Sequence, residues 1–391
     1  MDFKLSDRVQ RIKPSPTLLI TARAAELRAQ GKDIIGLGAG EPDFDTPEHI
    51  KQAATQAIAD GFTKYTAVDG IPELKTAVAT KLKRDNGLDY VPDQIIVSNG
   101  AKHSLFNLFQ ATIQEGDEVI IPAPYWVTYP ELVNYSGGTV VEIATNDKSG
   151  FKITPEQLKS AITSKTKMLI LTTPSNPTGS VYTKEELLAL ADILKGTDIL
   201  VASDEMYEKL IYDGEFTSAA AISEDMYNRT ITINGLSKSV AMTGWRFGYL
   251  AAKDTKLIKA MKKLQSQSTS NICSVTQKAA ITGLDGSADK DIEMMRQSFS
   301  LRRDEAVDLF NAIDGVSVIK PDGAFYLFVN INEIEKDSLK FSKALLEETG
   351  VAVVPGVGFG TDGHFRFSFA TDIESIREGI SRIKTFISNN Y

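Results

Sequence analysis

The pattern of apolar and polar positions alternates between helical and extended periods along the first two thirds of the chain. Helical patterns run from Pro47 to Gly61 and from Pro72 to Gly87, each opening on a proline and closing near a glycine. Between such stretches, short apolar runs predict strands at 94–97, 118–121, 139–143, 168–172 and 199–203. This alternation predicts an α/β fold, with a largely parallel sheet that helices cover on both faces. Such sheets bind ligands at the carboxyl ends of their strands.

After about residue 285 the pattern becomes that of an α+β lobe. A long helical stretch passes through Arg302–Arg303, and a closing helix is expected from about Ile373. Strands are expected near Val316 and at 324–329, 351–354 and 365–369. The run 33–37 predicts a strand without a helical partner nearby, so we expect the start of the chain to join this lobe. The predicted division is an N-terminal arm with part of the small domain (1–45), a large domain (46–285) and a small C-terminal domain (286–391).

Composition is that of an ordinary globular protein, with 42% apolar and 24% charged residues. The net charge of −8 and the absence of a basic tract argue against nucleic acid and anionic membranes as partners. No stretch approaches the ~18 apolar residues of a membrane span. Cys273 is the only cysteine, which excludes an internal disulfide, and we expect it to be packed as a small apolar residue. The histidines lie near no acidic pair with ligand spacing, so we expect no metal site, and a cytoplasmic protein is the simplest interpretation.

The strongest chemical signal is the segment from Asn234 to Ser239, which contains Lys238. A lysine amine condenses with an aldehyde when burial and a neighbouring cation lower its pKa. Arg246, eight residues further on, could supply that cation and pair with a phosphate. The alternative is a surface lysine on a short loop. The small and apolar residues around Lys238 weaken that alternative.

In this setting the chain resembles the class I and II aminotransferases, which are fold type I enzymes dependent on pyridoxal 5'-phosphate. The resemblance is to the bacterial aspartate aminotransferase-like subgroup and covers nearly the whole chain. The motifs occur in family order: Ala39 to Pro47, Lys64-Tyr65, Asn99 to Lys102, Pro124-Tyr125-Trp126, Asn176 to Gly179, Asp204 to Tyr207, and the segment around Lys238. Each motif alone is weak, whereas seven in order leave little room for chance.

The resemblance implies that Lys238 holds the cofactor as a Schiff base and then shuttles the substrate proton. It implies further contacts to the cofactor. Asp204 would pair with the pyridine nitrogen, Tyr207 and Asn176 with the phenolic oxygen, Trp126 with the ring face, and Gly100, Ala101, Lys102, Ser237 and Arg246 with the phosphate. Without the resemblance, the alternative for Asp204 is a helix N-cap, and an isolated tryptophan such as Trp126 would be assigned to the core. The chain departs from some relatives at Gly235, where they have a serine. Ser237 could take the place of that serine, and its contact with the phosphate stays open.

The substrate site follows from the same resemblance. Arg366 would clamp the α-carboxylate, with Gly40, Asn176 and Trp126 beside it; the alternative for Arg366 is an arginine on a surface strand. A dicarboxylic substrate needs a second cation for its side-chain carboxylate. Lys102, helped by the hydroxyl of Ser15, is the candidate, and Lys13 is a further basic group near the expected site entrance. Lys102 could instead serve only the phosphate. Tyr65 resembles the residue that reaches the phosphate of the neighbouring subunit, which implies a homodimer with shared active sites.

We therefore predict a ping-pong aminotransferase that converts L-aspartate and 2-oxoglutarate to oxaloacetate and L-glutamate. An aminotransferase for prephenate, aromatic or neutral amino acids is the alternative. A nicotinamide oxidoreductase is a poor alternative, because Glu41 replaces the last glycine of the dinucleotide fingerprint that starts at Gly36. In addition, Pro42 interrupts the helix that should follow that fingerprint. A ligand-sensing regulator built on this fold would need a DNA-binding module ahead of it.

Overall fold

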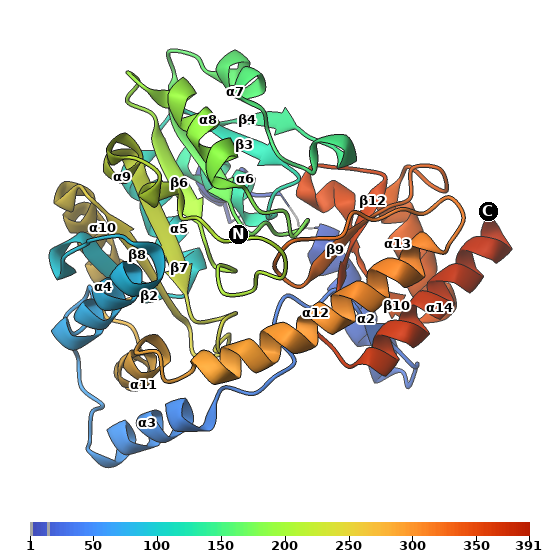
Figure 1. Ribbon diagram of the computed structural model, residues 1–391, viewed down its shortest axis with the longest axis horizontal. Helices are drawn as coiled ribbons and strands as arrows, with labels where there is room; N and C mark the ends of the chain where they lie inside the picture. Colours follow the sequence, from blue (N-terminus) through green and yellow to red (C-terminus); the bar gives the residue numbers. More distant parts are fainter. Residues whose placement is uncertain (1–2, 14–15) are drawn as a thin grey trace.

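The computed structural model describes residues 3–13 and 16–391, and its centre is a seven-stranded sheet (Figure 1). The strand order is β2-β8-β7-β6-β5-β3-β4. All neighbouring pairs are parallel except those of β8, which runs antiparallel to both β2 and β7. The strands are β2 (Ile95–Asn99), β3 (Glu118–Ala123), β4 (Thr139–Ala144), β5 (Thr166–Thr172), β6 (Leu200–Asp204), β7 (Thr230–Gly235) and β8 (Phe247–Ala252). The predicted α/β class with a largely parallel sheet is confirmed.

Helices cover both faces of this sheet because its strands are apolar on both sides. In β3, Val119 and Ile121 point into the apolar cluster that contains α5 (Ala101–Thr112) and α10 (Thr255–Ser268). Ile120 between them points into the cluster that contains α8 (Lys184–Leu194). These layers consist of α3 (Glu48–Ala59), α4 (Pro72–Asn86), α5 (Ala101–Thr112), α6 (Thr128–Ser136), α7 (Pro155–Ala161), α8 (Lys184–Leu194), α9 (Glu224–Arg229), α10 (Thr255–Ser268) and α11 (Ser274–Leu284). Short 3₁₀ turns lie at Pro92–Gln94, Asp147–Ser149, Ala219–Ala221 and Gly356–Phe359.

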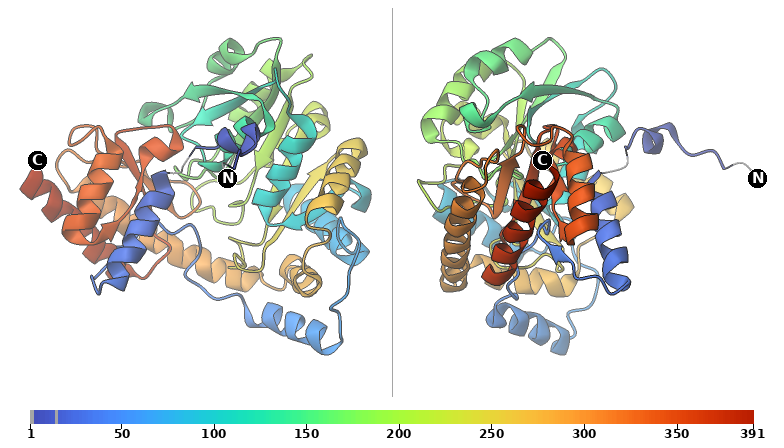
Figure 2. Two further views of the ribbon diagram at one scale, coloured as in Figure 1. Left: turned by 180° about the vertical axis from the view of Figure 1, so that it is seen from behind. Right: turned by 90° about the vertical axis from the view of Figure 1, so that its right-hand side faces the viewer.

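A smaller lobe carries a three-stranded antiparallel sheet of order β11-β12-β9. Its strands are β9 (Tyr326–Asn330), β11 (Val354–Pro355) and β12 (His364–Ser368), and its helices are α13 (Ser338–Thr349) and α14 (Ile373–Asn390). The long helix α12 (Asp289–Asn311) runs from beneath the large sheet to this lobe (Figure 1). From the start of the chain, α2 (Pro16–Ala29) packs on α13, and β1 (Ile35–Gly36) pairs in parallel with β10 (Val351–Ala352). The first helix, α1 (Asp7–Gln10), projects from one side of the molecule (Figure 2).

Several sequence predictions were wrong in detail. No strand forms near Val316; the adjacent Ser317 makes only an isolated bridge to Asn330. The strand expected at 351–354 is divided between β10 and β11, and neither β7 nor β8 was predicted. Cys273, the residue directly before α11, is exposed rather than packed. None of the helices in the described ranges is long and apolar enough to cross a bilayer.

Candidate active site

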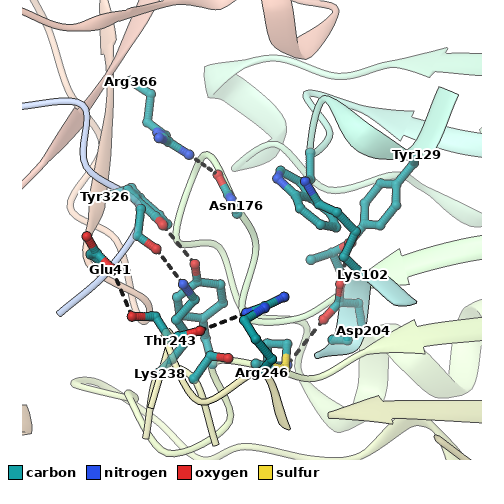
Figure 3. A pocket seen from close by; sticks show the side chains of 17 residues that line it. Glu41, Lys102, Tyr129, Asn176, Asp204, Lys238, Thr243, Arg246, Tyr326 and Arg366 are labelled. Atoms are coloured by element: carbon teal, nitrogen blue, oxygen red, sulfur yellow. Dashed lines mark hydrogen bonds between the residues drawn. The ribbon is translucent and has the colours of Figure 1, made fainter. Parts of the chain in front are cut away.

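A cavity of about 440 Å³ opens at the carboxyl ends of β5 and β6 (Figure 3). Thr172 and Asp204 come from these strand ends, while Tyr326 and Arg366 come from β9 and β12 of the small sheet. The cavity therefore lies where the two sheets face each other. The predicted site residues that line it are Gly40, Ala101, Lys102, Trp126, Asn176, Asp204, Tyr207, Ser237, Lys238, Arg246 and Arg366.

Lys238 lies on the loop that follows β7, and its ammonium Nζ points into the cavity. It donates a hydrogen bond to the carbonyl oxygen of Gly40. Burial lowers the pKa of Lys238 to about 8, and the positive charges of Arg366 and Arg246 act in the same direction. A solvated surface lysine, the alternative considered from the sequence, is therefore wrong. The site holds an amine that is neutral in part of the population near pH 8.

Asp204 ends β6 and is almost fully buried, with 6% of its surface exposed. Burial raises the pKa of its carboxyl group, and the hydrogen bond that Oδ2 accepts from the Tyr129 hydroxyl at 2.7 Å opposes that rise. Oδ1 accepts a second bond from the backbone N–H of Met206 at 3.3 Å. No helix of the described chain begins directly after Asp204, so a helix cap is not its role. It is a buried carboxylate held by two donors at the cavity wall.

The N-terminus of α5 and Arg246 together form a cup that favours an anion. Gly100 caps the helix with φ +84°, and a Cβ there would lie 2.4 Å from Nη2 of Arg246. The first N–H groups of α5, from Ala101 and Lys102, have no acceptor within the helix and carry its positive dipole end. Arg246 is held by bonds to the carbonyl oxygens of Thr243 at 2.8 Å and Asn99 at 3.3 Å. Backbone donors beside a guanidinium are the groups that a phosphate requires.

Arg366 is buried, with 6% of its surface exposed, so the surface-strand alternative is wrong. Its Nη1 donates to Oδ1 of Asn176 and its Nη2 to the carbonyl oxygen of Gly38, both at 2.8 Å. The guanidinium also lies 4.3 Å above the Tyr326 ring. Its Nε has no hydrogen-bond acceptor among the described residues. This fixed, incompletely paired guanidinium can bind a carboxylate.

Lys102 and Trp126 line the cavity next to each other. The ammonium of Lys102 lies 4.9 Å from the centre of the Trp126 indole. Partial burial, followed by the charge of Arg246, lowers the pKa of Lys102. In Figure 3, Lys102 and Arg366 approach the cavity from different sides. A cation is thus available at each side of the same space.

Sequence reasoning missed several residues that line the cavity. Tyr129 bonds Asp204, Tyr326 shares a 2.8 Å hydrogen bond with Tyr207, and Glu41 accepts a 2.8 Å bond from Thr243. Tyr129 follows the Pro-Tyr-Trp motif at helical spacing, a signal that could have identified it. Thr172 and Met206 complete the missed residues.

Three predicted residues lie away from the cavity or outside the described ranges. Tyr65 is 91% exposed in this single chain. Lys13 is exposed and does not line the cavity; its backbone N–H donates to Glu131. Ser15 lies outside the described residues. At Gly235, where some relatives have a serine, a Cβ would lie 2.8 Å from the carbonyl oxygen of Phe247, so a side chain there would require the local backbone to shift.

Comparison with known proteins identifies the family. The family model described as "Aminotransferase class I and II" matches residues 32–383. The chain belongs to the class I and II aminotransferases. It is 51% identical to the aspartate/prephenate aminotransferase of Cereibacter sphaeroides, with 98% of each chain covered. It is 50% identical to the aspartate aminotransferase of Bacillus subtilis, with 99% of this chain and 100% of the relative covered.

Solved aminotransferase structures have the same fold. The aspartate aminotransferase of Rhizobium meliloti matches with a TM-score of 0.96 at 44% identity, with 99% of each chain covered. The aspartate aminotransferase of Thermus thermophilus with maleate matches with a TM-score of 0.94 at 45% identity, with 98% of this chain and 100% of that chain covered. The predicted family and fold type I are confirmed, and this chain is an aminotransferase. The family depends on pyridoxal 5'-phosphate and acts on amino acids and 2-oxo acids.

Proposed function

We propose that this aminotransferase transfers the amino group of L-aspartate to 2-oxoglutarate by a ping-pong mechanism, yielding oxaloacetate and L-glutamate. The observation that carries the proposal is the pair of cations, Arg366 and Lys102, at different sides of one cavity that also contains Lys238. A dicarboxylic amino acid has an anionic group for each cation. The names of the Bacillus subtilis and Rhizobium meliloti relatives support aspartate, and maleate in the Thermus thermophilus structure is itself a dicarboxylate.

The residues around the cavity fit pyridoxal 5'-phosphate. The cup formed by Gly100, Ala101, Lys102 and Arg246 would hold the phosphate, with Ser237 beside it. Asp204 would hold a proton on the pyridine nitrogen, Tyr207 and Asn176 would donate to the phenolic oxygen, and Trp126 would cover the ring face. Lys238 would bind the aldehyde carbon covalently through Nζ. When bound, this cofactor withdraws electrons from Cα of the substrate and so makes its proton acidic.

Lys238 is the group in the cavity that can move the Cα proton. The lowered pKa of the free Lys238 amine leaves much of it neutral at mildly alkaline pH. A neutral amine accepts a proton, and the resulting ammonium can return it to a neighbouring carbon. Proton removal and proton return can therefore use one nitrogen atom.

Arg366 would orient the substrate through its α-carboxylate, beside Gly40 and Asn176. Because this carboxylate is common to all amino acids, Arg366 cannot select among them. Selection falls to the other side of the cavity, where Lys102 would pair with the distal carboxylate. Ser15, which lies outside the described residues, and Lys13 stay candidates for the same role.

The exposed ring of Tyr65 supports a homodimer in which this residue completes the phosphate site of the partner subunit. Within each subunit, the boundaries at residues 45 and 285 would separate the arm, the large domain and the small domain. A cytoplasmic location completes the proposal.

A panel of amino donors tests the substrate assignment. Purified enzyme loaded with pyridoxal 5'-phosphate is mixed with each donor, and the visible absorption of the bound cofactor is followed before and after 2-oxo acid is added. We expect aspartate and glutamate to bleach the absorption fastest, and 2-oxoglutarate to restore it. Prephenate belongs among the acceptors because of the name of the Cereibacter sphaeroides relative. A panel in which phenylalanine or alanine outruns aspartate would overturn the dicarboxylate assignment.

A further inference from the structure

Tyr129 connects three elements at the bottom of the cavity. It lies in the first turn of α6 and is 1% exposed. Its hydroxyl donates to Oδ2 of Asp204 at the end of β6, at 2.7 Å, and accepts from the hydroxyl of Thr172 at the end of β5, at 2.9 Å. The direction of these two hydrogen bonds follows from their groups. The carboxylate of Asp204 can only accept, so the Tyr129 hydroxyl donates to it, and the Thr172 hydroxyl donates to the Tyr129 oxygen.

Tyr129 also supports Trp126. The two rings meet edge to face, with 5.4 Å between centres and 85° between planes, and the backbone N–H of Tyr129 bonds the carbonyl oxygen of Trp126 at 3.0 Å. One side chain therefore contacts both the carboxylate and the aromatic residue that the proposed function places against the cofactor ring. Figure 3 shows Tyr129 and Asp204 on the same side of the cavity.

The environment of Asp204 makes such a donor necessary. Burial favours the neutral acid and raises the pKa of Asp204, whereas only the carboxylate can stabilise a proton on a pyridine nitrogen. The bond from Tyr129 is the largest influence that opposes burial. Burial and the nearby carboxylate of Asp204 raise the pKa of Tyr129 well above its usual value, so its hydroxyl stays a donor at every assay pH.

We propose that Tyr129, itself oriented by Thr172, is a positioning residue that keeps Asp204 ionised and aimed at the pyridine nitrogen of the cofactor. This inference rests on the proposed function. Tyr129 acts through Asp204, and Thr172 acts only through Tyr129. The two hydroxyls therefore act in series, and removing either one should change the protonation of the pyridine nitrogen.

The test uses holoenzyme loaded with cofactor that carries ¹⁵N in the pyridine ring. In Tyr129→Phe we expect the ¹⁵N resonance to move toward unprotonated pyridine at a given pH. We expect kcat to fall on the order of ten- to a hundredfold, as for a lost bond to a charged group, with KM for aspartate nearly unchanged. Thr172→Val should shift the resonance in the same direction by less, and Thr172→Ser should restore the wild-type value. Added to Tyr129→Phe, Thr172→Val should change nothing further.

Tyr182→Phe is the matched control. Tyr182 is also a buried tyrosine, 5% exposed, and its oxygen accepts a bond from the backbone N–H of Ile153 away from the cavity. We expect its ¹⁵N resonance and kcat to equal those of wild type. An unchanged resonance in both Tyr129→Phe and Thr172→Val, or equal losses in Tyr129→Phe and Tyr182→Phe, would overturn the inference while leaving the proposed function intact. A wild-type protein that binds no cofactor would overturn both.

Discussion

Lys102 offers the sharpest test of substrate choice, because methionine can replace it without removing its stem. A charge-assisted contact to a carboxylate contributes roughly 1.5–3 kcal/mol, which corresponds to about ten- to a hundredfold in kcat/KM. The cation–π contact with Trp126, whose centre lies 4.9 Å from Nζ, is worth about 0.5–1 kcal/mol at an open site. That smaller loss affects every substrate alike and cancels in a ratio. We therefore expect Lys102→Met to reduce kcat/KM for aspartate about ten- to a hundredfold relative to phenylalanine.

The assay measures kcat/KM for both donors with 2-oxoglutarate, and in parallel the dissociation constant of the cofactor. Lys159→Met is the control, since Lys159 is exposed on α7 and lies outside the cavity. Its ratio of aspartate to phenylalanine should match wild type. Equal losses for both donors in Lys102→Met, accompanied by weaker cofactor binding, would refute the reasoning and assign Lys102 to the phosphate.

Three further predictions follow from other parts of the molecule. Cofactor capture by the apoenzyme needs the neutral amine of Lys238, so its rate should rise with pH through about 8. Arg366→Met should move that midpoint upward, because it removes the positive charge that lowers the pKa of Lys238 most; a midpoint that stays in place contradicts this electrostatic account. Mixing Lys238→Ala subunits with Tyr65→Phe subunits should produce hybrid dimers with one wild-type site and one doubly altered site. If subunits exchange and the activity of the mixture never exceeds that of the two parental homodimers, the result would count against shared sites. Gly235→Ser should lower the free energy of unfolding by about 1–3 kcal/mol in urea denaturation, because the Cβ of the serine would crowd the backbone. Gly244→Ser, with open space around it, should change the free energy of unfolding little. Equal effects of the two substitutions would refute the steric explanation.

Much of the fold and of the chemistry is local in the sequence, and for that reason could be predicted. Strands such as 118–121 and 168–172 are buried on both faces, so their apolar runs are nearly continuous. Lys238 is recognisable because it lies in a short segment of small and apolar residues with Arg246 close behind. Asp204 stands directly after an apolar strand, where an α/β sheet presents its ligand-binding groups.

The particular pairings and hydrogen bonds between distant segments could not be predicted, because no local pattern encodes them. Only the tertiary structure decided that β1 pairs with β10, and that Arg366 bonds Asn176 and Gly38. The pKa of Lys238 likewise depends on burial and on Arg366, which lies far along the chain.

Tyr129 shows the same division within one residue. Its position in α6 follows from helical spacing after Trp126, but its hydroxyl gains a role only because β5 and β6 bring Thr172 and Asp204 to it. The sequence by itself determined which chemical groups this protein carries and the strand ends and turns that hold them. Folding decided which groups share a buried space, where charges lose water and change their pKa values.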